Sequence, residues 1–235
     1  MRSTYMPINF VHKLLHRVEE GWDPISLEYA KKYDRFASNE IDTVLVKRLD
    51  ALSSGLEGKR VLDLGGGPGH YSVLFAKCGA RVTWHDVSRE YEKIARKRAE
   101  DCGLSLDFSL GYLEEAKKFG ENSFDLVFCR VCWYYSKSDR AFGRLLYSLV
   151  KPGGMGYIEC NTPPFSHAKG MRKLQSWLNG RLWWKIGHPM PPHGRIAKLI
   201  QNYPIERLEL DYSSDLCDVV LFVKRRGVPC CPTAA

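Results

Sequence analysis

An acid and a run of glycines are the residues of this chain whose types and spacing most directly support chemistry. The segment VLDLGGGPGH places Asp63, Gly65, Gly67 and Gly69 at every second position. Glycines in such a run let the backbone turn sharply and let a ligand approach it closely. A carboxylate at Asp63 would repel a pyrophosphate, but it would attract a cationic ligand, such as one with an amino group and a sulfonium. The segment therefore predicts a binding corner for a cationic small molecule.

A dinucleotide site at this corner would require the spacing G-x-G-x-x-G ahead of a helix. No register of the segment fits, because a required glycine falls on His70, Ser72 or Pro68. An NAD(P)-dependent oxidoreductase is thus disfavoured, and it is kept as the alternative from another functional class.

The elements that would position these residues alternate along the chain. Apolar runs predict strands, and apolar residues at helical spacing predict helices between them. The expected strands cover 60–66, 81–88, 104–110, 124–131 and 155–161. Helices are expected over 8–20, 68–79, 88–103 and 139–154, and one or two helices over 26–53. This alternation indicates parallel βαβ units. Two later strands, 205–213 and 218–226, are joined by so few residues that they must pair antiparallel.

A second acid, Asp86, ends the strand VTWHDVS, one βαβ step after Asp63. Together these features resemble the class I S-adenosylmethionine-dependent methyltransferases, whose first motif reads (D/E)-x-G-x-G-x-G. The segments FDLVFCRV at 124–131 and LVKPGG at 149–154 resemble the family's fourth strand and the turn before its fifth. The resemblance covers residues 25–225.

The resemblance implies an α/β protein with a three-layer αβα Rossmann-like methyltransferase fold. Its seven-stranded sheet would have the order 3-2-1-4-5-7-6, with strand 7 antiparallel. We expect a single domain over 1–235, whose parts are a helical cap (1–57), a cofactor-binding core (58–162), an inserted acceptor cap (163–203), a hairpin (204–226) and a tail (227–235). The implied cofactor is S-adenosyl-L-methionine, which becomes S-adenosyl-L-homocysteine when its methyl group passes in line to a small-molecule acceptor.

The resemblance also implies a set of cofactor-binding residues. Asp86 would take the ribose hydroxyls, and Tyr33 would cover the cofactor. The full set is Tyr33, Asp63, Gly65, Gly66, Gly67, Gly69, Asp86, Val87, Tyr112, Leu113 and Arg130. The chain departs from the family after its third strand, where Tyr112 replaces the usual adenine-binding acid. Adenine would instead rest on Tyr112 or Leu113, with Glu114 as a substitute acid.

Residues after the fourth and fifth strands should line the acceptor side. The candidates are Arg130, Trp133, Tyr134, Tyr135, Glu159, Asn161 and Thr162, joined by Arg172 and Arg181 from the insertion. Trp133 could equally pack a helix. The catalytic candidates are Tyr134, His188 and His193. Histidine titrates near neutral pH, but two incidental histidines in a proline-stiffened loop are the favoured interpretation of GHPMPPHG.

The net charge of +8 is concentrated in the insertion. The segment 166–207 contains eight Lys or Arg residues and only one acid, Glu206. Trp177, Trp183 and Trp184 lie in the same segment. A small acceptor that carries phosphate or carboxylate would suit such a surface. RNA or protein methylation is the alternative within the class, although nucleic acid is not favoured. A solvated basic face and a non-catalytic cofactor-binding relative are the other interpretations.

The chain has eight cysteines and no secretory signal, which favours reduced thiols in a cytoplasmic protein. Its single CxxC, at 129–132, has no further ligands to complete a metal site, so none is expected. No apolar run approaches the roughly 18 residues that a membrane-spanning helix needs. The acceptor, the methylated atom and the oligomeric state remain open.

Overall fold

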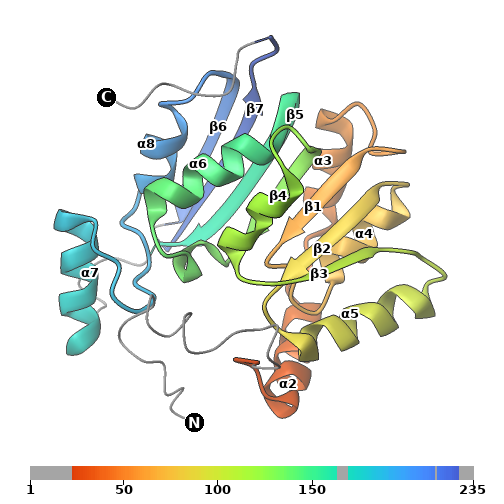
Figure 1. The fold of residues 1–235 in the computed structure, drawn as a ribbon, viewed down its shortest axis with the longest axis horizontal. Coiled ribbons are helices and arrows are strands. Elements are labelled where there is room, and N and C mark those ends of the chain that lie inside the picture. The colour runs from red at the N-terminus through yellow and green to blue at the C-terminus, as the bar shows by residue number, and fades with distance from the viewer. Residues whose placement is uncertain (1–22, 163–168, 215, 228–235) are drawn as a thin grey trace.

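The computed structural model describes residues 23–162, 169–214 and 216–227. Within them lies a seven-stranded sheet of order β3-β2-β1-β4-β5-β7-β6 (Figure 1). The strands are β1 (Arg60–Leu64), β2 (Arg81–Asp86), β3 (Asp107–Leu110), β4 (Phe124–Arg130), β5 (Val150–Asn161), β6 (Ile205–Ser214) and β7 (Cys217–Lys224). The expected helix over 8–20 and Cys230 and Cys231 lie outside the described residues.

The sheet is parallel from β3 to β5, and β7 runs antiparallel to both β5 and β6. The predicted fold class and strand order are therefore confirmed. Because β7 is antiparallel, its first residues lie beside the carboxyl end of β5, where Asn161 pairs with Cys217. The ends of β1, β2, β4 and β5 and the β6–β7 turn thus share one edge, which is where ligands bind in open α/β sheets.

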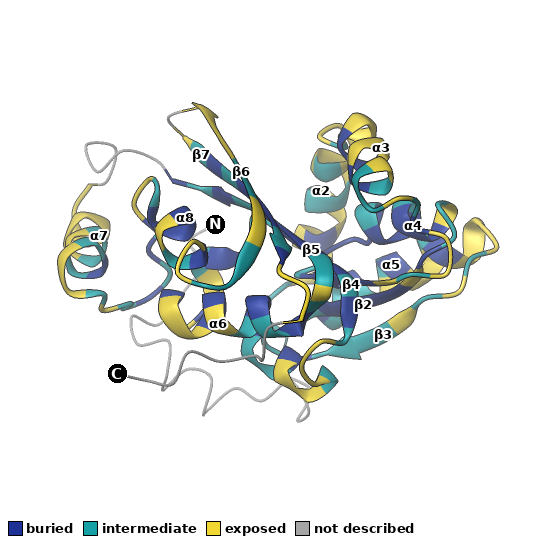
Figure 2. Cartoon of the chain, turned by 90° about the horizontal axis from the view of Figure 1, so that it is seen from above, coloured by how far each residue is buried: buried dark blue, intermediate teal, exposed yellow. Residues whose placement is uncertain are grey.

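Helices cover both faces of the sheet. One layer holds α2 (Leu27–Ser38), α3 (Thr43–Leu52), α4 (His70–Lys77) and α5 (Arg89–Asp101). The other holds the 3₁₀ helices η2 (Leu113–Phe119) and η3 (Trp133–Tyr135) with α6 (Asp139–Leu149) and α8 (Arg195–Ile200). Figure 2 shows buried residues on the central strands and the inner helix faces, and exposed residues outside. The central strands are almost wholly apolar because both of their faces are covered.

The segment after α6 differs from the prediction. The helix ends at Leu149, three residues before Pro152, and β5 already begins at Val150. Proline cannot donate a ladder hydrogen bond, and it is tolerated at irregular edges of a strand. Pro152 lies on the register shift by which β5 passes from the Phe124–Val150 pair to the Leu126–Met155 pair, and Gly153 adopts a φ of 77° there. The motif LVKPGG therefore forms a bulged strand entry rather than a helix end.

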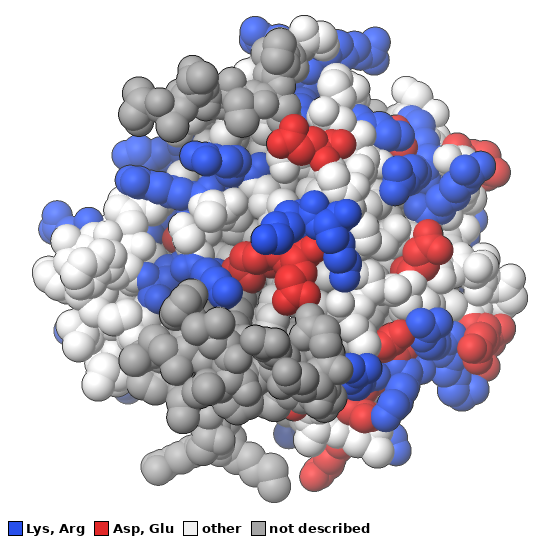
Figure 3. Space-filling model, in the orientation of Figure 1, with Lys and Arg blue, Asp and Glu red and all other residues white. Residues whose placement is uncertain are grey.

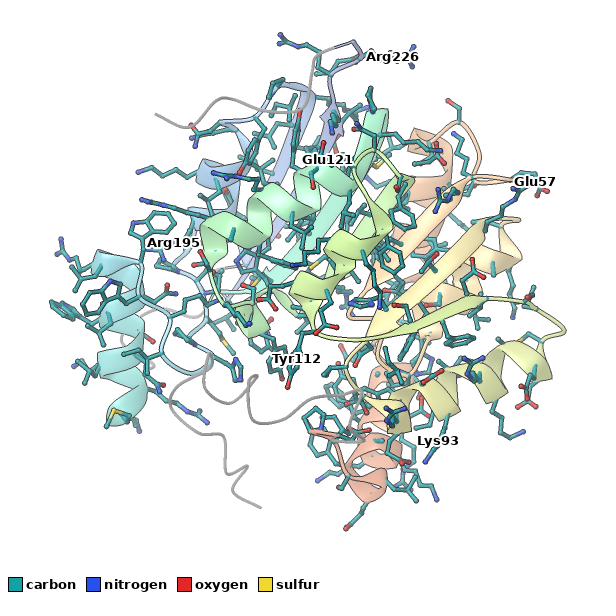
Figure 4. The ribbon with its side chains drawn as sticks, viewed as in Figure 1. Glu57, Lys93, Tyr112, Glu121, Arg195 and Arg226 are labelled. Atoms are coloured by element: carbon teal, nitrogen blue, oxygen red, sulfur yellow. The ribbon has the colours of Figure 1, made fainter. Side chains whose placement is uncertain are left out.

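The insertion contributes α7 (Met171–Leu182) and α8, and a buried ionic network attaches it to the core. Asp139, at the start of α6, accepts from Lys185 Nζ at 2.9 Å, from Arg195 Nη1 at 3.3 Å and from Trp133 Nε1 at 3.0 Å. The side chains of Lys185 and Asp139 are each 1% exposed. Figure 4 shows Arg195 between α6 and α7, where its guanidinium stacks on the Trp183 ring at 3.9 Å.

We expect Asp139→Ala to lower the free energy of unfolding by about 3–5 kcal/mol, because it leaves two buried cations without their counter-ion. Denaturant titration of the purified protein measures this. Asp101→Ala is the matched control, since it breaks an ion pair with Lys97 in which both side chains are more than half exposed; its unfolding midpoint should stay unchanged. Equal losses in the two variants would contradict a structural role for the network.

Candidate cofactor and acceptor site

The glycine corner joins β1 to α4, and it is bonded to β2. Gly65 N and Gly66 N both donate to His85 O, at 2.8 and 3.2 Å. A Cβ at Gly66 would lie 2.3 Å from Trp84 Cδ1, and the indole of Trp84 donates to Gly67 O at 2.9 Å. A Cβ at Gly69 would lie 2.6 Å from that of Ala95 on α5. The protein's own packing therefore requires glycine at 66 and 69.

Gly67 is different, because open space lies over it. Its φ is +49°, and the nearest atom to a Cβ built there would be Tyr33 Cε1, at 4.0 Å. Tyr33 is a half-buried residue of α2 whose ring packs against Tyr91 at 5.7 Å. The bare backbone of Gly67 thus faces a tyrosine ring across an open gap. This arrangement fits a ligand that lies on the corner beneath Tyr33.

Asp86 is held by backbone amides at the end of β2. Its Oδ2 accepts from Gly67 N and its Oδ1 from Ser88 N, both at 3.0 Å. Burial raises the pKa of Asp86 to about 6, although these amides oppose the rise. A carboxylate offers about four lone-pair positions, so capacity for a ligand donor remains beside the amides of Gly67, Ser88 and Val87. Val87, the next residue, is half-buried.

Asp63 lies beneath the corner rather than open to it. Its side chain accepts from Ser72 Oγ at 2.5 Å, and the residue is only 3% exposed. Burial raises its pKa to about 7, and the charge of Asp86 raises it further while the Ser72 hydroxyl lowers it. Two buried carboxyl groups therefore act on the same corner, and both become easier to ionise if a cation binds there.

An ionic cluster around the carboxylate of Asp34 fixes helix α2 above the corner. Asp34 contacts His70 Nε2 of α4 at 2.9 Å and Arg98 Nη2 of α5 at 2.6 Å. Arg98 Nε also donates to Pro68 O within the corner, at 3.1 Å. Because Tyr33 precedes Asp34, these bonds determine where the tyrosine lies.

The predicted adenine side is formed by the segment after β3. Leu113 is 8% exposed and borders Gly65, whereas Tyr112 is half-buried. Tyr112 projects from the lower edge of the sheet in Figure 4. Its carbonyl accepts from His85 Nε2 at 3.0 Å, and burial lowers the pKa of His85 to about 4, so this histidine is neutral. Glu114 Oε1 already accepts from Lys137 N at 2.5 Å.

Arg130 ends β4 in an ion pair with its strand neighbour. Its Nε donates to Glu159 Oε2 at 2.8 Å, and Tyr157 donates to the same oxygen at 3.1 Å. Arg130 nevertheless acts on the corner electrostatically, since its charge lowers the pKa of Tyr33, which burial raises. The next residue, Val131, has a φ of +56°, which is a strained conformation for a β-branched side chain. Such strain is common where a strand end shapes a site.

The aromatic residues after β4 separate into core and site. Trp133 is fully buried, packs on Phe142 at 5.0 Å and donates to Asp139. Its acceptor-side role is therefore corrected to helix packing. Tyr134 is half-buried, and its pKa is raised strongly, first by burial and also by Tyr135 and Tyr33. The raised pKa favours the neutral phenol, and the catalytic and acceptor-side roles of Tyr134 stay predictions.

The remaining candidates are spread along the same edge. Asn161 is half-buried, and Thr162 is 1% exposed and donates to Asp218 Oδ1 at 3.0 Å. His188 packs edge-on against Tyr135 at 5.0 Å. His193 Nδ1 lies 2.6 Å from Asp218 Oδ1.

Arg172 and Arg181 are exposed on α7. Figure 3 shows a largely uncharged surface at the left end, over α7, with lysine and arginine nearer to α6 and α8. Lys185 and Arg195 are engaged in the Asp139 network. The insertion is thus less basic toward solvent than its composition suggests.

Several residues that build the site were not predicted. Trp84, Ser72 and the Asp34 cluster act through long-range contacts that leave no spacing pattern. Asp218 did leave a signal, because an acid that opens an apolar strand such as DVVLFV must be buried with partners. Cys129 and Cys132 are free buried thiols 3.3 Å apart, and no metal-binding group of His, Cys, Asp or Glu occurs in the described ranges.

Comparisons with known proteins agree with this geometry. Residues 61–154 match the model of a family described as a methyltransferase domain. The ubiquinone biosynthesis O-methyltransferase of Xanthomonas euvesicatoria is 37% identical over 113 residues, which cover 47% of each chain. That of Idiomarina loihiensis is 30% identical over 142 residues, 60% of this chain and 55% of its own. The chain thus spans about half the length of the curated relatives that it matches.

Solved structures share the fold at low identity. TehB from Haemophilus influenzae has a TM-score of 0.58 at 14% identity, with 79% of this chain and 63% of its own covered. The [4+2]-cyclase SpnF has a TM-score of 0.57 at 17% identity, with 77% and 81% covered. A phosphoethanolamine N-methyltransferase of Haemonchus contortus, in complex with S-adenosylhomocysteine, has a TM-score of 0.55 at 17% identity, with 72% and 49% covered.

The family match covers the glycine corner, both acids and the whole of β4, and it ends at Gly154, within the first residues of β5. Residues 61–154 of this chain therefore match a methyltransferase domain, and the sheet has the strand order that the resemblance to class I S-adenosylmethionine-dependent methyltransferases implied.

Proposed function

We propose that the chain transfers a methyl group from S-adenosylmethionine to a hydroxyl oxygen of a small molecule. The observation that carries the proposal is the corner itself: Asp86 is fixed by the amide of Gly67, beside open backbone beneath Tyr33. The oxygen acceptor is supported by the curated relatives, which are O-methyltransferases of ubiquinone biosynthesis.

Three groups of this chain would hold the cofactor. Asp86 has acceptor capacity left for the ribose hydroxyls, and the buried Asp63 adds negative charge where an amino group and a sulfonium would lie. Tyr33 would cover the cofactor, while Tyr112 and Leu113 would flank adenine. The bound cofactor supplies an electrophilic methyl group, so the protein's main task is to orient the acceptor and exclude water.

The acceptor would lie over the ends of β4 and β5. Tyr134, Tyr135 and His188 provide aromatic surface there, which suits a ring-bearing acceptor. Arg172 and Arg181 would attract a phosphate or carboxylate on that acceptor. Among the residues that the structure describes, no helix is long and apolar enough to cross a bilayer.

Replacing Asp86 by asparagine should weaken S-adenosylmethionine binding roughly 10- to 100-fold, because charge-assisted hydrogen bonds of 1.5–3 kcal/mol are lost. Titration calorimetry measures this, with NAD as the comparison ligand. Asp125→Asn is the matched control, since Asp125 lies at the opposite edge of the sheet, paired with Lys151. Unchanged affinity in both Asp86→Asn and the Asp63→Ala/Asp86→Ala double variant would overturn the cofactor assignment, as would comparable binding of NAD.

Cofactor affinity should fall as the pH is lowered from 8 to 5. Both acids have raised pKa values, about 7 for Asp63 and about 6 for Asp86, so each is increasingly protonated below its pKa while the ligand favours the charged form. Binding at pH 6 should therefore release protons, which calorimetry in two buffers of different ionisation enthalpy detects. The release should be smaller in Asp86→Asn. Proton release that is identical in the two proteins would contradict the contribution of Asp86.

If the acceptor is anionic, replacing Arg172, Lys173 and Arg181 together by alanine should raise its Michaelis constant several-fold at low salt. The difference should shrink at high salt, because screening weakens exposed charges. A triple alanine variant at Lys93, Arg96 and Lys97 makes the same change in charge on α5 and should have no effect. Turnover is followed as S-adenosylhomocysteine, which also excludes a non-catalytic relative. An unchanged Michaelis constant at low salt would rule out anion steering by α7.

A further inference from the structure

A histidine–aspartate pair lies at the acceptor edge of the sheet. His193 Nδ1 is 2.6 Å from Asp218 Oδ1, and Asp218 is completely buried. The same carboxylate accepts from Thr162 Oγ1 at 3.0 Å and from Gly194 N at 2.7 Å. A buried carboxylate with three donors is rigid, so it fixes both the position and the tautomer of the imidazole.

The other ring nitrogen of His193 faces outward. The side chain is 46% exposed, and its ring packs against Tyr212 of β6 at 4.7 Å. Within the described residues, Nε2 has no hydrogen-bond partner. With Nδ1–H donating to Asp218, the neutral imidazole has its lone pair on Nε2, which is the form that accepts a proton from a substrate.

The pair and the cofactor corner share one edge of the sheet. Asp218 is the second residue of β7 and pairs with Cys160 of β5, and Thr162 directly follows β5. Glu159 of β5 pairs on one side with Arg130 of β4 and on the other with Val219, the residue after Asp218. The neighbouring Cys217 thiol senses the same charges. Burial raises its pKa to about 11, the charges of Glu159 and Asp218 raise it as well, and that of Arg130 lowers it. The charge of Arg130 also reaches Tyr33. The Arg130–Glu159 ion pair therefore lies between the corner and the histidine.

We propose that His193 is the general base of the methyl transfer and that Asp218 is its positioning residue. The inference rests on the proposed function. His193 Nε2 takes the proton of the acceptor hydroxyl, while the hydroxyl oxygen forms its bond to the methyl carbon. The carbon–sulfur bond breaks, and its electron pair stays on sulfur, which becomes neutral. The imidazolium that results is paired with Asp218 until its proton passes to water.

The test compares two acceptors that differ in acidity. Catechol needs a base to lose its proton at neutral pH, whereas a ring-nitrated catechol is largely ionised already. His193→Gln should lower kcat about 10²- to 10⁴-fold on catechol, as expected for loss of general-base catalysis, and only a few-fold on the nitrated compound. Added imidazole should restore part of the catechol activity in His193→Ala. Lys198→Gln, an exposed change on the adjoining helix α8, should affect neither acceptor.

The outcomes separate the base from a structural role and from the proposed function. His193→Gln should keep its calorimetric affinity for S-adenosylmethionine, and the rise of the wild-type kcat with pH should be lost on catechol. Asp218 of β7 and Tyr212 of β6 are the titratable groups that face the imidazole in the described structure, so Tyr212→Phe should retain that rise. An equal loss on both catechols, without rescue by imidazole, overturns the base and leaves the proposed function standing. A wild-type protein that binds the cofactor but methylates neither compound overturns both the acceptor class and the base.

Discussion

The hydrogen bond between the Asp86 carboxylate and the amide of Gly67 is the constraint on which the site depends. It joins the end of β2 to the turn that follows β1, so the two strand ends cannot separate without leaving a buried carboxylate unsatisfied. Trp84 strengthens the same connection from below, because its indole donates to the carbonyl of Gly67. Both backbone polar groups of Gly67 are therefore bonded to side chains of β2, and the turn is preorganised. Preorganisation lowers the entropy lost when a ligand binds.

The charge balance of the corner explains which ligand it suits. Asp63 and Asp86 are buried close enough to act on one another, and their raised pKa values show that ionisation is disfavoured without a partner. Arg130, the cation whose charge reaches Tyr33 above the corner, is ion-paired with Glu159 instead. Arg98 bonds only to the Pro68 carbonyl of the corner and to Asp34, so neither Asp63 nor Asp86 is ion-paired among the described residues, and a positively charged ligand would supply that partner. A pyrophosphate would add negative charge instead, which agrees with the failure of the dinucleotide pattern.

The fold could be predicted from the sequence because local patterns determine it. Apolar strands, an N-cap serine such as Ser88 and a terminal glycine such as Gly79 each signal their element within a few residues. The site was predicted only where a motif reports it, as at Asp63, Gly67 and Asp86, whose functional roles stay predictions. Trp133 could not be assigned in advance, since its partner Asp139 marks only a helix start in the sequence. The buried network with Lys185 depends on a contact across 46 residues, which no spacing rule contains.

Contacts of the insertion with α6 and with β7 of the closing hairpin together hold the segment around His193 in place. Lys185 and Arg195 are neutralised by Asp139 on α6, and that network fixes the insertion to the end of β4. The backbone amide of Gly194 then donates to Asp218 on β7, so the segment between these anchors must hold His193 beside that strand. Lys185 and Arg195 belong to the basic residues that suggested an anionic acceptor, and their charges instead attach the insertion to α6. In the proposed function, the glycine corner holds the methyl donor, and these added segments hold the histidine that would meet the acceptor.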